Sequence, residues 1–358
     1  MRANGVAVSS PFALSANGIS ADGSTIVGDS VNGSYIARVS PYGSGAINLK
    51  DMYKSLEGRT LAGNFLLAST WLLPSGAHSL PLSRRVAPGK AGYWLAGDIG
   101  RNQSEGVAGP SGLAEVGFGR HFGPLQVNTA IGRTSARQGV DQGAPSKLDG
   151  NYVMVEALAP LFGPASRGPW VIVGGYYHSG AANVLRSYFN AGLPAVSTGN
   201  TSTRSWGVRA RIEWDDAVRD KRFALSPFIQ ANMNQARMLG YEETGGGFPA
   251  QFDARTEKNT ELHAGLNGSV LLGSSQARLI AIAEYSKRFE GSSTATAGTF
   301  PGLFGFTVPG MSLQREWHRT GLGFEAPVGE GVVSLIANSS SRRDAPSWWV
   351  AASWRTSF

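Results

Sequence analysis

The sequence contains no cysteine, few charged residues and no long hydrophobic run. The absence of cysteine excludes a disulfide-stapled fold, a thiolate metal site and cysteine catalysis. The best candidate for a hydrophobic run, residues 62–73, is shorter than the roughly 18 apolar residues that a membrane-spanning helix needs. Intrinsic disorder is also excluded, because aromatic residues make up 10% of the chain and disordered chains are poor in them.

The chain is instead basic and rich in glycine: 48 of its 358 residues are glycine, and its net charge is +7. A basic chain can bind nucleic acid, but here the basic residues are scattered and adjacent ones form only pairs such as Arg84-Arg85. We therefore expect no nucleic-acid partner. The N-terminal apolar stretch is interrupted at Ser9, Ser10 and Pro11 and does not match a secretory signal, so we expect either that the protein is not exported or that the chain begins downstream of its export signal.

From about residue 91 onward, apolar and polar residues alternate within segments that are separated by turn-forming residues. In residues 205–214, Trp206 and Ile212 belong to one face of an extended chain, whereas Arg209 and Arg211 belong to the other. A period of two residues is typical of β-strands with one apolar and one polar face. The second part of the chain is therefore predicted to be all-β.

Twelve such segments follow one another, at residues 91–101, 112–122, 124–136, 149–161, 168–180, 203–215, 222–236, 257–272, 276–288, 314–326, 329–340 and 346–358. Strands of soluble proteins usually have about 5 to 6 residues, so the length of these segments argues against a soluble β-sandwich or propeller. Short connections alternate with long ones, as they do in outer-membrane barrels. The pattern predicts a twelve-stranded antiparallel transmembrane β-barrel over residues 91–358, with long loops at 138–148, 181–204, 239–257 and 291–313.

The last strand ends on an aromatic residue, Phe358, which shares its apolar face with Trp354 and Trp348. A chain end is normally frayed and wet, so an aromatic terminus is unusual in a soluble protein. Phe358 and Trp348 are about one membrane strand apart, as expected for the two aromatic girdles of an outer-membrane barrel.

The first 90 residues do not follow the strand pattern. Residues 1–46 contain short β-prone runs, and residues 47–90 are predicted to be a helical linker or plug. Within it, a helix over 47–73 has Asn48 as a possible cap and an apolar stripe of Leu49, Met52, Tyr53, Leu56 and Leu61. A helix is about 10–12 Å wide, so one helix is expected to fill the lumen of a twelve-stranded barrel.

The polar faces of the predicted strands carry the side chains that are expected to line the lumen as a hydrated network: Asp98, Glu156, Arg209, Arg211, Glu213, Glu261, His263, Arg278, Glu284 and Arg355. An enzymatic alternative is that His263, beside Glu261, activates a serine or water, as in a barrel-embedded lipase or protease. A second candidate nucleophile is Ser30 in the block Gly28-Asp29-Ser30, which is similar to esterase motifs. A turn explains that block better, because a serine nucleophile also needs a histidine, an acid and a folded domain around it. We predict no enzyme, no cofactor and no metal site.

Four segments carry a family resemblance: GYWLAGDIG at 92–100, SYFNAGLPAVSTGNTSTRSWGVRARIEW at 187–214, YEETGGGFPAQFDARTEKNTELHAGLNG at 241–268, and WRTSF at 354–358. Through them, residues 85–358 resemble the translocator domain of the type V autotransporters of Gram-negative bacteria. The resemblance implies a twelve-stranded barrel with an N-terminal helix in its lumen. Residues 19–40 are similar to the HAF-type repeats of some autotransporter passengers, which implies that residues 1–46 are a passenger remnant.

The resemblance also implies a function and partners. The barrel is expected to insert into the bacterial outer membrane and to export or anchor an N-terminal passenger at the cell surface. Phe358 and Trp354 are implied to belong to the signal that the barrel assembly machinery reads. Further expected partners are outer-membrane lipid, lipopolysaccharide and the chain's own passenger, with the protein a monomer. The open alternative to a translocator, besides the enzyme, is a passive outer-membrane pore.

Overall fold

The computed structural model describes residues 2–3, 6–7, 15–31, 33–76, 78–103, 108–140, 143–162, 168–273 and 276–358. It describes the backbone alone at residues 2–3, 6–7, 58–69, 140 and 143–145.

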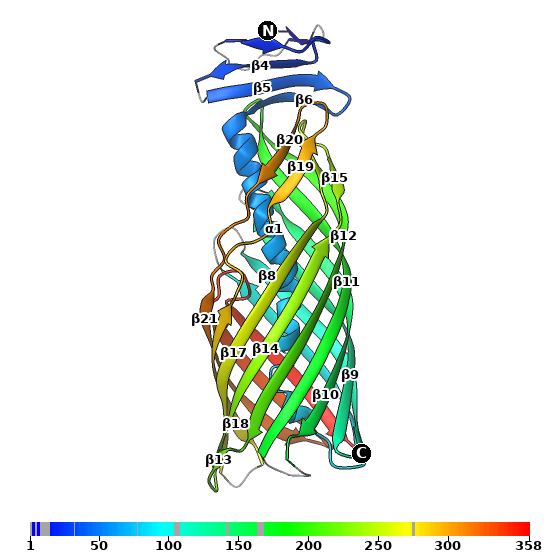
Figure 1. The fold of residues 1–358 in the computed structure, drawn as a ribbon, viewed down its shortest axis with the longest axis vertical. Helices are drawn as coiled ribbons and strands as arrows, with labels where there is room; N and C mark the ends of the chain where they lie inside the picture. The colour runs from blue at the N-terminus through cyan, green and yellow to red at the C-terminus, as the bar shows by residue number, and fades with distance from the viewer. Residues whose placement is uncertain are drawn as a thin grey trace.

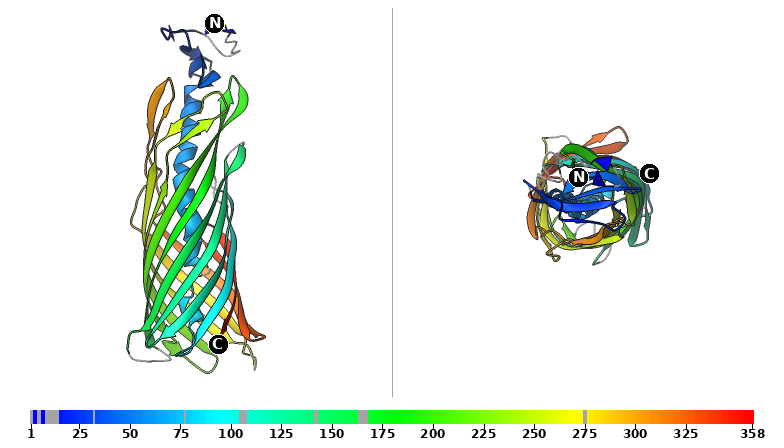
Figure 2. Two further views of the ribbon diagram at one scale, coloured as in Figure 1. Left: turned by 90° about the vertical axis from the view of Figure 1, so that its right-hand side faces the viewer. Right: turned by 90° about the horizontal axis from the view of Figure 1, so that it is seen from above.

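Twelve long antiparallel strands form a closed barrel (Figures 1 and 2). They are β7 (Ala91–Asn102), β8 (Gly109–Phe122), β9 (Leu125–Val140), β10 (Gly143–Pro160), β11 (Gly168–Asn190), β12 (Leu193–Asp215), β14 (Phe223–Met238), β17 (Arg255–Leu271), β18 (Arg278–Arg288), β21 (Glu316–Val328), β22 (Gly331–Ser340) and β23 (Trp348–Ser357). The barrel closes where β23 pairs with β7, and there Phe358 N donates to Ala91 O over 2.9 Å. Closure leaves no unpaired strand edge, as a bilayer requires. The predicted fold class is confirmed.

Two of the predicted long loops are in fact strand. β11 and β12 continue past the expected ends at residues 180 and 203 and meet at a tight turn, where Ala191 and Gly192 have φ of 51° and 82°. In the same way, β9 and β10 extend through the loop predicted at 138–148. The prediction ended these strands early because their outward faces become polar, which a strand in lipid would not tolerate but a strand above the bilayer does.

The other two predicted loops contain short strands that extend the wall upward. They are β15 (Tyr241–Thr244), β16 (Gln251–Phe252), β19 (Thr296–Phe300) and β20 (Phe304–Val308). β13 (Val218–Arg219) lies at the opposite end, beside β14. The wall is therefore taller on the side of β11, β12, β14 and β17 than on the side of β8 and β21 (Figure 1).

The N-terminal part of the chain forms a sheet above the barrel and a helix inside it (Figure 2). The sheet contains β3 (Gly18–Ile19), β4 (Thr25–Ser30), β5 (Gly33–Ser40) and β6 (Gly43–Asn48), and a separate pair contains β1 (Arg2–Ala3) and β2 (Val6–Ala7). Helix α1 (Leu49–Ser75) has 27 residues, about 40 Å of helix, and is followed by the short helix η1 (Pro81–Arg84). Asn48 caps α1, since its side chain accepts from Lys50 N over 2.8 Å. α1 begins at Leu49 and ends at Ser75 rather than spanning the predicted residues 47–73.

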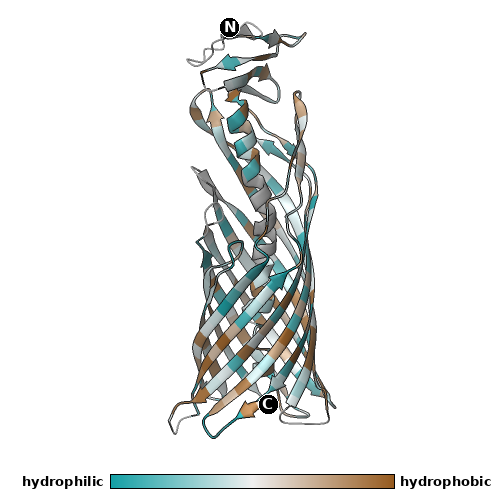
Figure 3. Ribbon diagram, turned by 60° about the vertical axis from the view of Figure 1, so that its left-hand side comes forward, coloured by the Kyte–Doolittle hydropathy of each residue, from teal (hydrophilic) through white to brown (hydrophobic). Residues whose placement is uncertain are grey.

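The two faces of the wall differ as the alternating pattern requires. On β12, Trp206 and Ile212 are 39% and 47% exposed, whereas Arg209 and Arg211 are buried inside. The exposed apolar side chains are concentrated on the lower part of the wall (Figure 3). Within the described residues, no helix combines the length and hydrophobicity needed to cross a bilayer.

Candidate functional site: the filled lumen

The upper half of α1 packs against aromatic side chains from the outer loops. Met52 and Leu56 are fully buried in one cluster with Phe248, Phe300 and Phe306, and Leu49 packs against the edge of this cluster. Three residues of the predicted apolar stripe thus contact the barrel.

Tyr53 does not follow this prediction. Its side chain is 50% exposed and borders a cavity of about 400 Å³ that is also lined by Val27, Asp29 and Phe304. The helical spacing of apolar residues includes Tyr53 in the stripe, but the wall is low on one side, so the upper turns of α1 have a face toward solvent (Figure 1). The side chain of Leu61 lies outside the described residues.

A fully buried arginine on β11 links the helix, the wall and an outer loop. Arg186 Nη2 pairs with Glu243 Oε2 at 2.7 Å, and Arg186 Nη1 donates to Ser55 Oγ of α1 over 3.0 Å. The guanidinium also donates to the carbonyl of Phe248 and lies 5.3 Å from the ring of Phe300. We call Arg186 and Glu243 the upper clasp, because the two side chains hold the loop that contains Phe248 over the helix.

A second arginine fixes the N-terminal sheet to the same loops. Arg38 on β5 donates from Nη2 to Gly247 O over 3.1 Å and from Nη1 to Pro301 O over 3.0 Å. Burial lowers the pKa of Arg38, but a guanidinium stays charged at any physiological pH. On the neighbouring edge strand β6, Ala46 N donates to Asn190 Oδ1 over 2.9 Å. The sheet therefore contacts three outer connections of the barrel, at Asn190, Gly247 and Pro301.

At mid-height, the connection between β22 and β23 folds into the lumen and meets α1. Trp71 of the helix and Trp349 of β23 form an edge-to-face pair with ring centroids 5.0 Å apart. Arg342 lies over the rings of Trp71 and Trp317, at 5.4 and 4.5 Å, and its Nη1 pairs with Glu261 Oε1 at 2.6 Å. The helix and this loop together occupy the lumen at this level.

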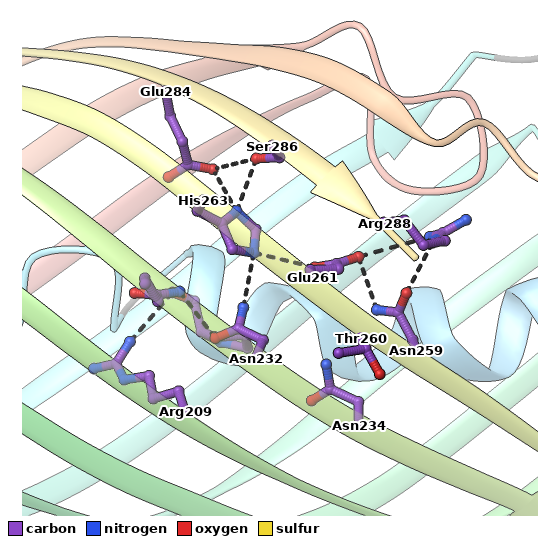
Figure 4. A network of polar contacts seen from close by, with 12 residues as sticks. Arg209, Asn232, Asn234, Asn259, Thr260, Glu261, His263, Glu284, Ser286 and Arg288 are labelled. Carbon is purple, nitrogen blue, oxygen red and sulfur yellow. Dashed lines mark hydrogen bonds and ion pairs between the residues drawn. The ribbon is translucent and has the colours of Figure 1, made fainter. Parts of the chain in front are cut away.

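His263 lies in a buried polar network below that loop (Figure 4). Its Nδ1 is 2.8 Å from Ser286 Oγ and 3.1 Å from Glu284 Oε1, and its Nε2 is 3.3 Å from Glu261 Oε2. A serine, a histidine and two carboxylates are thus together, as the enzymatic alternative required. However, Ser286 is fully buried and donates to Glu284 Oε1 over 3.0 Å, so its hydroxyl is occupied in the network and closed to substrate. The arrangement is that of a buried ionic network centred on His263.

Below α1, a second histidine is held between two carboxylates. His78 Nε2 is 2.8 Å from Glu115 Oε2, and His78 Nδ1 is 3.3 Å from Glu156 Oε2. Arg209 pairs with Glu156 and donates from Nη1 to His78 O over 2.7 Å, while Arg84 pairs with Glu115 at 3.3 Å. These contacts fix the chain that leaves the helix against β8, β10 and β12.

The remaining predicted lumen residues line the lower half. Asp98 is buried against the C-terminal end of α1 at Gly76. Arg211 pairs with Glu213 at 2.7 Å. Arg278 and Arg355 border a cavity of about 620 Å³ at the lower mouth, where Arg355 also pairs with Glu325 at 2.6 Å. The structure thus places all of the predicted lumen-facing side chains on the inner side of the wall.

The lower rim carries the aromatic residues of the chain end. Phe358 is 62% exposed, and the ring of Tyr93 on β7 lies 6.1 Å from that of Phe358 and 5.6 Å from that of Trp354. These rings face outward across the β23–β7 seam.

The sequence does not predict several residues of the site, which are His78, Glu115, Arg186, Glu243, Arg342 and Asp344 of the barrel and its lumen, and Arg38 of the sheet above. Arg186 and Glu243 fall in stretches predicted as loops, and Arg342 follows the end of a strand. A usable signal for Arg186 is that Val184, Arg186 and Tyr188 continue the alternation of the strand before them.

The Gly28-Asp29-Ser30 block is part of a hairpin. Ser30 Oγ donates to Gly33 O over 2.7 Å, and Asp29 accepts from Asn17 and Ser34. These local hydrogen bonds agree with the turn interpretation. In the part of the chain that the structure describes, no group of three or more histidine or carboxylate side chains is arranged to hold a metal ion.

Comparison with known proteins supports the same architecture. The autotransporter beta-domain family model matches residues 93–338. Among solved structures, the translocator domain of the autotransporter NalP from Neisseria meningitidis superposes with a TM-score of 0.58 at 15% identity, covering 85% of this chain and 96% of that one. The beta domain of the Bordetella autotransporter BrkA gives a TM-score of 0.53 at 16% identity, covering 75% of this chain and all of that one.

A curated relative, Esterase EstA from Pseudomonas aeruginosa, is 28% identical over 197 residues, which is 52% of this chain and 29% of that protein. Esterase EstA from Pseudomonas putida matches to the same extent. The chain therefore spans less than a third of the length of the curated relatives that it matches.

The closed barrel, its lipid-compatible outer face and its helix-filled lumen define an outer-membrane β-barrel with an internal plug. The match over residues 93–338 identifies its family: the chain belongs to the autotransporters, and its barrel is an autotransporter beta-domain, an outer-membrane translocator of a passenger.

Proposed function

We propose that the barrel carries the N-terminal segment outward across the outer membrane and then retains it at the cell surface, with α1 closing the lumen. The path of the chain carries this proposal. The chain enters the wall at Ala91 on the lower rim, while α1 rises through the lumen and joins the sheet above the upper rim (Figure 2). The sheet that precedes α1 lies beyond the upper rim, while α1 itself lies in the lumen (Figure 2). An N-terminal segment exported through the barrel would follow this path.

The lengths of the connections support this orientation. Outer-membrane barrels have short periplasmic turns and longer extracellular loops. Short turns such as Gly123-Pro124 and Gly329-Glu330 lie at the end that carries the C-terminus, and the loops with β15, β16, β19 and β20 lie at the end that carries the sheet. The passenger side is therefore the extracellular side.

A surface-labelling experiment tests the orientation. An epitope inserted between Asp22 and Gly23, in the turn before β4, is expected to be labelled by antibody on intact cells, because Asp22 is exposed and the sheet lies above the barrel (Figure 2). The matched control is the same epitope in the Gly329-Glu330 turn, which is expected to be labelled only after the outer membrane is permeabilised. The reverse pattern, with the second site labelled on intact cells and the first silent, contradicts the proposal.

We further propose that the barrel has no catalytic activity of its own. The name esterase refers to the whole relative, which is more than three times as long as the part that matches this chain. The candidate serine of the barrel, Ser286, is fully buried among ion-paired side chains. The proposed partners are the outer-membrane lipid, the barrel assembly machinery and the chain's own passenger segment. The protein is proposed to act as a monomer, since the barrel has no open edge at which a second copy could add a strand.

The chain end gives a prediction about assembly. Deletion of Phe358 removes the outermost ring at the seam and both backbone hydrogen bonds that join Phe358 to Ala91. We expect a clear fall in the amount of folded barrel in the outer membrane, measured by heat-modifiable gel mobility of membrane fractions. Phe358→Tyr keeps the ring and the backbone and is expected to assemble like the unaltered chain. Equal amounts of all three proteins would remove Phe358 from the assembly signal.

A further inference from the structure

Two arginines lie directly opposite each other on the outer face of the wall. Arg204 of β12 is the register partner of Arg237 of β14, and both are exposed. Directly opposed residues of antiparallel strands have Cβ atoms about 4.5–5.5 Å apart, and like charges there are destabilising. Among the side chains that the structure describes, no carboxylate forms an ion pair with either arginine. The pair therefore has an unfavourable charge interaction that nothing within the described chain offsets.

A third cation extends this patch onto the next strand. Lys258 of β17 is opposite Gln235, and Gln235 lies two residues before Arg237 on the same outer face of β14. Lys258 is thus a diagonal neighbour of Arg237, within reach of long side chains. The three cations lie on three adjacent strands. A second like-charged pair, Arg137 and Lys147, differs because Asp149 lies on the same face two residues from the lysine.

The patch lies at the upper edge of the hydrophobic band. Trp206 follows Arg204 on the outer face of β12, and its register partner on β11 is Tyr177; the two rings are 39% and 47% exposed. Below them, the outer face of β12 is apolar down to Trp214, eight residues or about 26 Å of strand away. Figure 3 shows the hydrophobic residues concentrated on the lower part of the wall. Tyr177 and Trp206 therefore mark one membrane interface, and the cations lie at the level of the lipid headgroups above it.

We propose that Arg204, Arg237 and Lys258 bind a phosphate group of the phosphorylated glycolipid of the outer leaflet, with Trp206 and Tyr177 against the base of its headgroup. Guanidinium groups bind phosphate oxygens through paired hydrogen bonds. An anion between Arg204 and Arg237 converts their repulsion into attraction toward a shared ligand. The proposal rests on the proposed function, because that orientation makes the upper rim the outer-leaflet side.

Native mass spectrometry of the purified full chain in detergent, with lipid A as the probe, tests the site. The unaltered chain is expected to retain lipid A. The double variant Arg204→Gln, Arg237→Gln is expected to bind it roughly tenfold or more weakly, since two charge-assisted contacts are lost. The double variant should fold, because it removes a repulsive pair, and heat-modifiable gel mobility checks this. Arg120→Gln, which alters an exposed arginine at the opposite rim, is the matched control and should bind as the unaltered chain does.

Equal binding of lipid A by the folded double variant would overturn the proposal. Equal binding of dephosphorylated lipid A by the unaltered chain would overturn it too, since the contact would then be made by acyl chains alone. Because this measurement uses purified protein and the epitope labelling uses intact cells, a failure of the lipid site is distinguishable from a failure of the proposed orientation.

Discussion

Removal of the lumen helix is expected to turn a closed barrel into an open pore. A chain that starts at residue 77 lacks the sheet and α1 but keeps His78 and η1, so Glu115 and Glu156 keep their partner. α1 occupies a cross-section about 10–12 Å wide, and without it the lumen is lined by charged side chains that hold water. In planar bilayers we expect the full chain to stay near the baseline and the shortened chain to show large, stable conductance steps.

The control for this prediction separates the helix from the sheet above it. A chain that starts at residue 47 lacks most of the sheet but keeps Asn48 and all of α1, including the pair of Trp71 with Trp349. It is expected to conduct as little as the full chain. If it conducts as much as the chain that starts at residue 77, then the sheet and not the helix closes the barrel. If the full chain already conducts strongly, the passive-pore alternative gains support.

The barrel was predictable because the bilayer imposes a simple rule on its wall. Each lipid-facing position must be apolar and each lumen-facing position can be polar, so twelve alternating segments, such as the one with Trp206 and Arg209, identify twelve strands. Trp317 is out of phase with Leu322 and Phe324, which face outward on the same strand. It faces inward, where it is 1% exposed and packs on Arg342.

The parts that escaped prediction lie where that rule does not apply. Above the bilayer both faces of β11 are polar or mixed, so the continued alternation at Val184, Arg186 and Tyr188 is the one local signal that Arg186 lies inside the barrel. The ion-pair partners are also far apart in the sequence, so local patterns cannot predict them: Glu243 is 57 residues away from Arg186, and His78 is 37 residues away from Glu115. Tyr53 is exposed because the wall is lower on its side, and the spacing of apolar residues within α1 contains no information about the height of the wall.

Loss of the upper clasp is expected to be the most damaging single change above the bilayer. In Arg186→Ala, Glu243 keeps its charge in a fully buried position without its cation, and breaking a buried pair in this way costs about 3–5 kcal/mol. Arg186 is nine residues beyond Tyr177 on β11, about 30 Å along the strand, so the effect is expected to be local to the outer loops. Limited proteolysis of intact cells is expected to cut this variant within residues 241–252 and to leave the same segment of the unaltered chain intact.

A double variant distinguishes two ways in which the upper clasp could hold the loop: compensation of the Glu243 charge, or the specific hydrogen bonds of the Arg186 guanidinium. Arg186→Met with Glu243→Leu removes both charges while it keeps most of the volume, and Ser55 retains its own bond to Met52 O. We expect this variant to regain most of the protease resistance that Arg186→Ala loses. Arg219→Ala, which breaks the exposed pair with Asp216 at the opposite rim, should have an effect below about 1 kcal/mol. If the double variant is as susceptible as Arg186→Ala, charge compensation does not hold the loop. The hydrogen bonds of the guanidinium to Phe248 O and Ser55 Oγ then hold it instead.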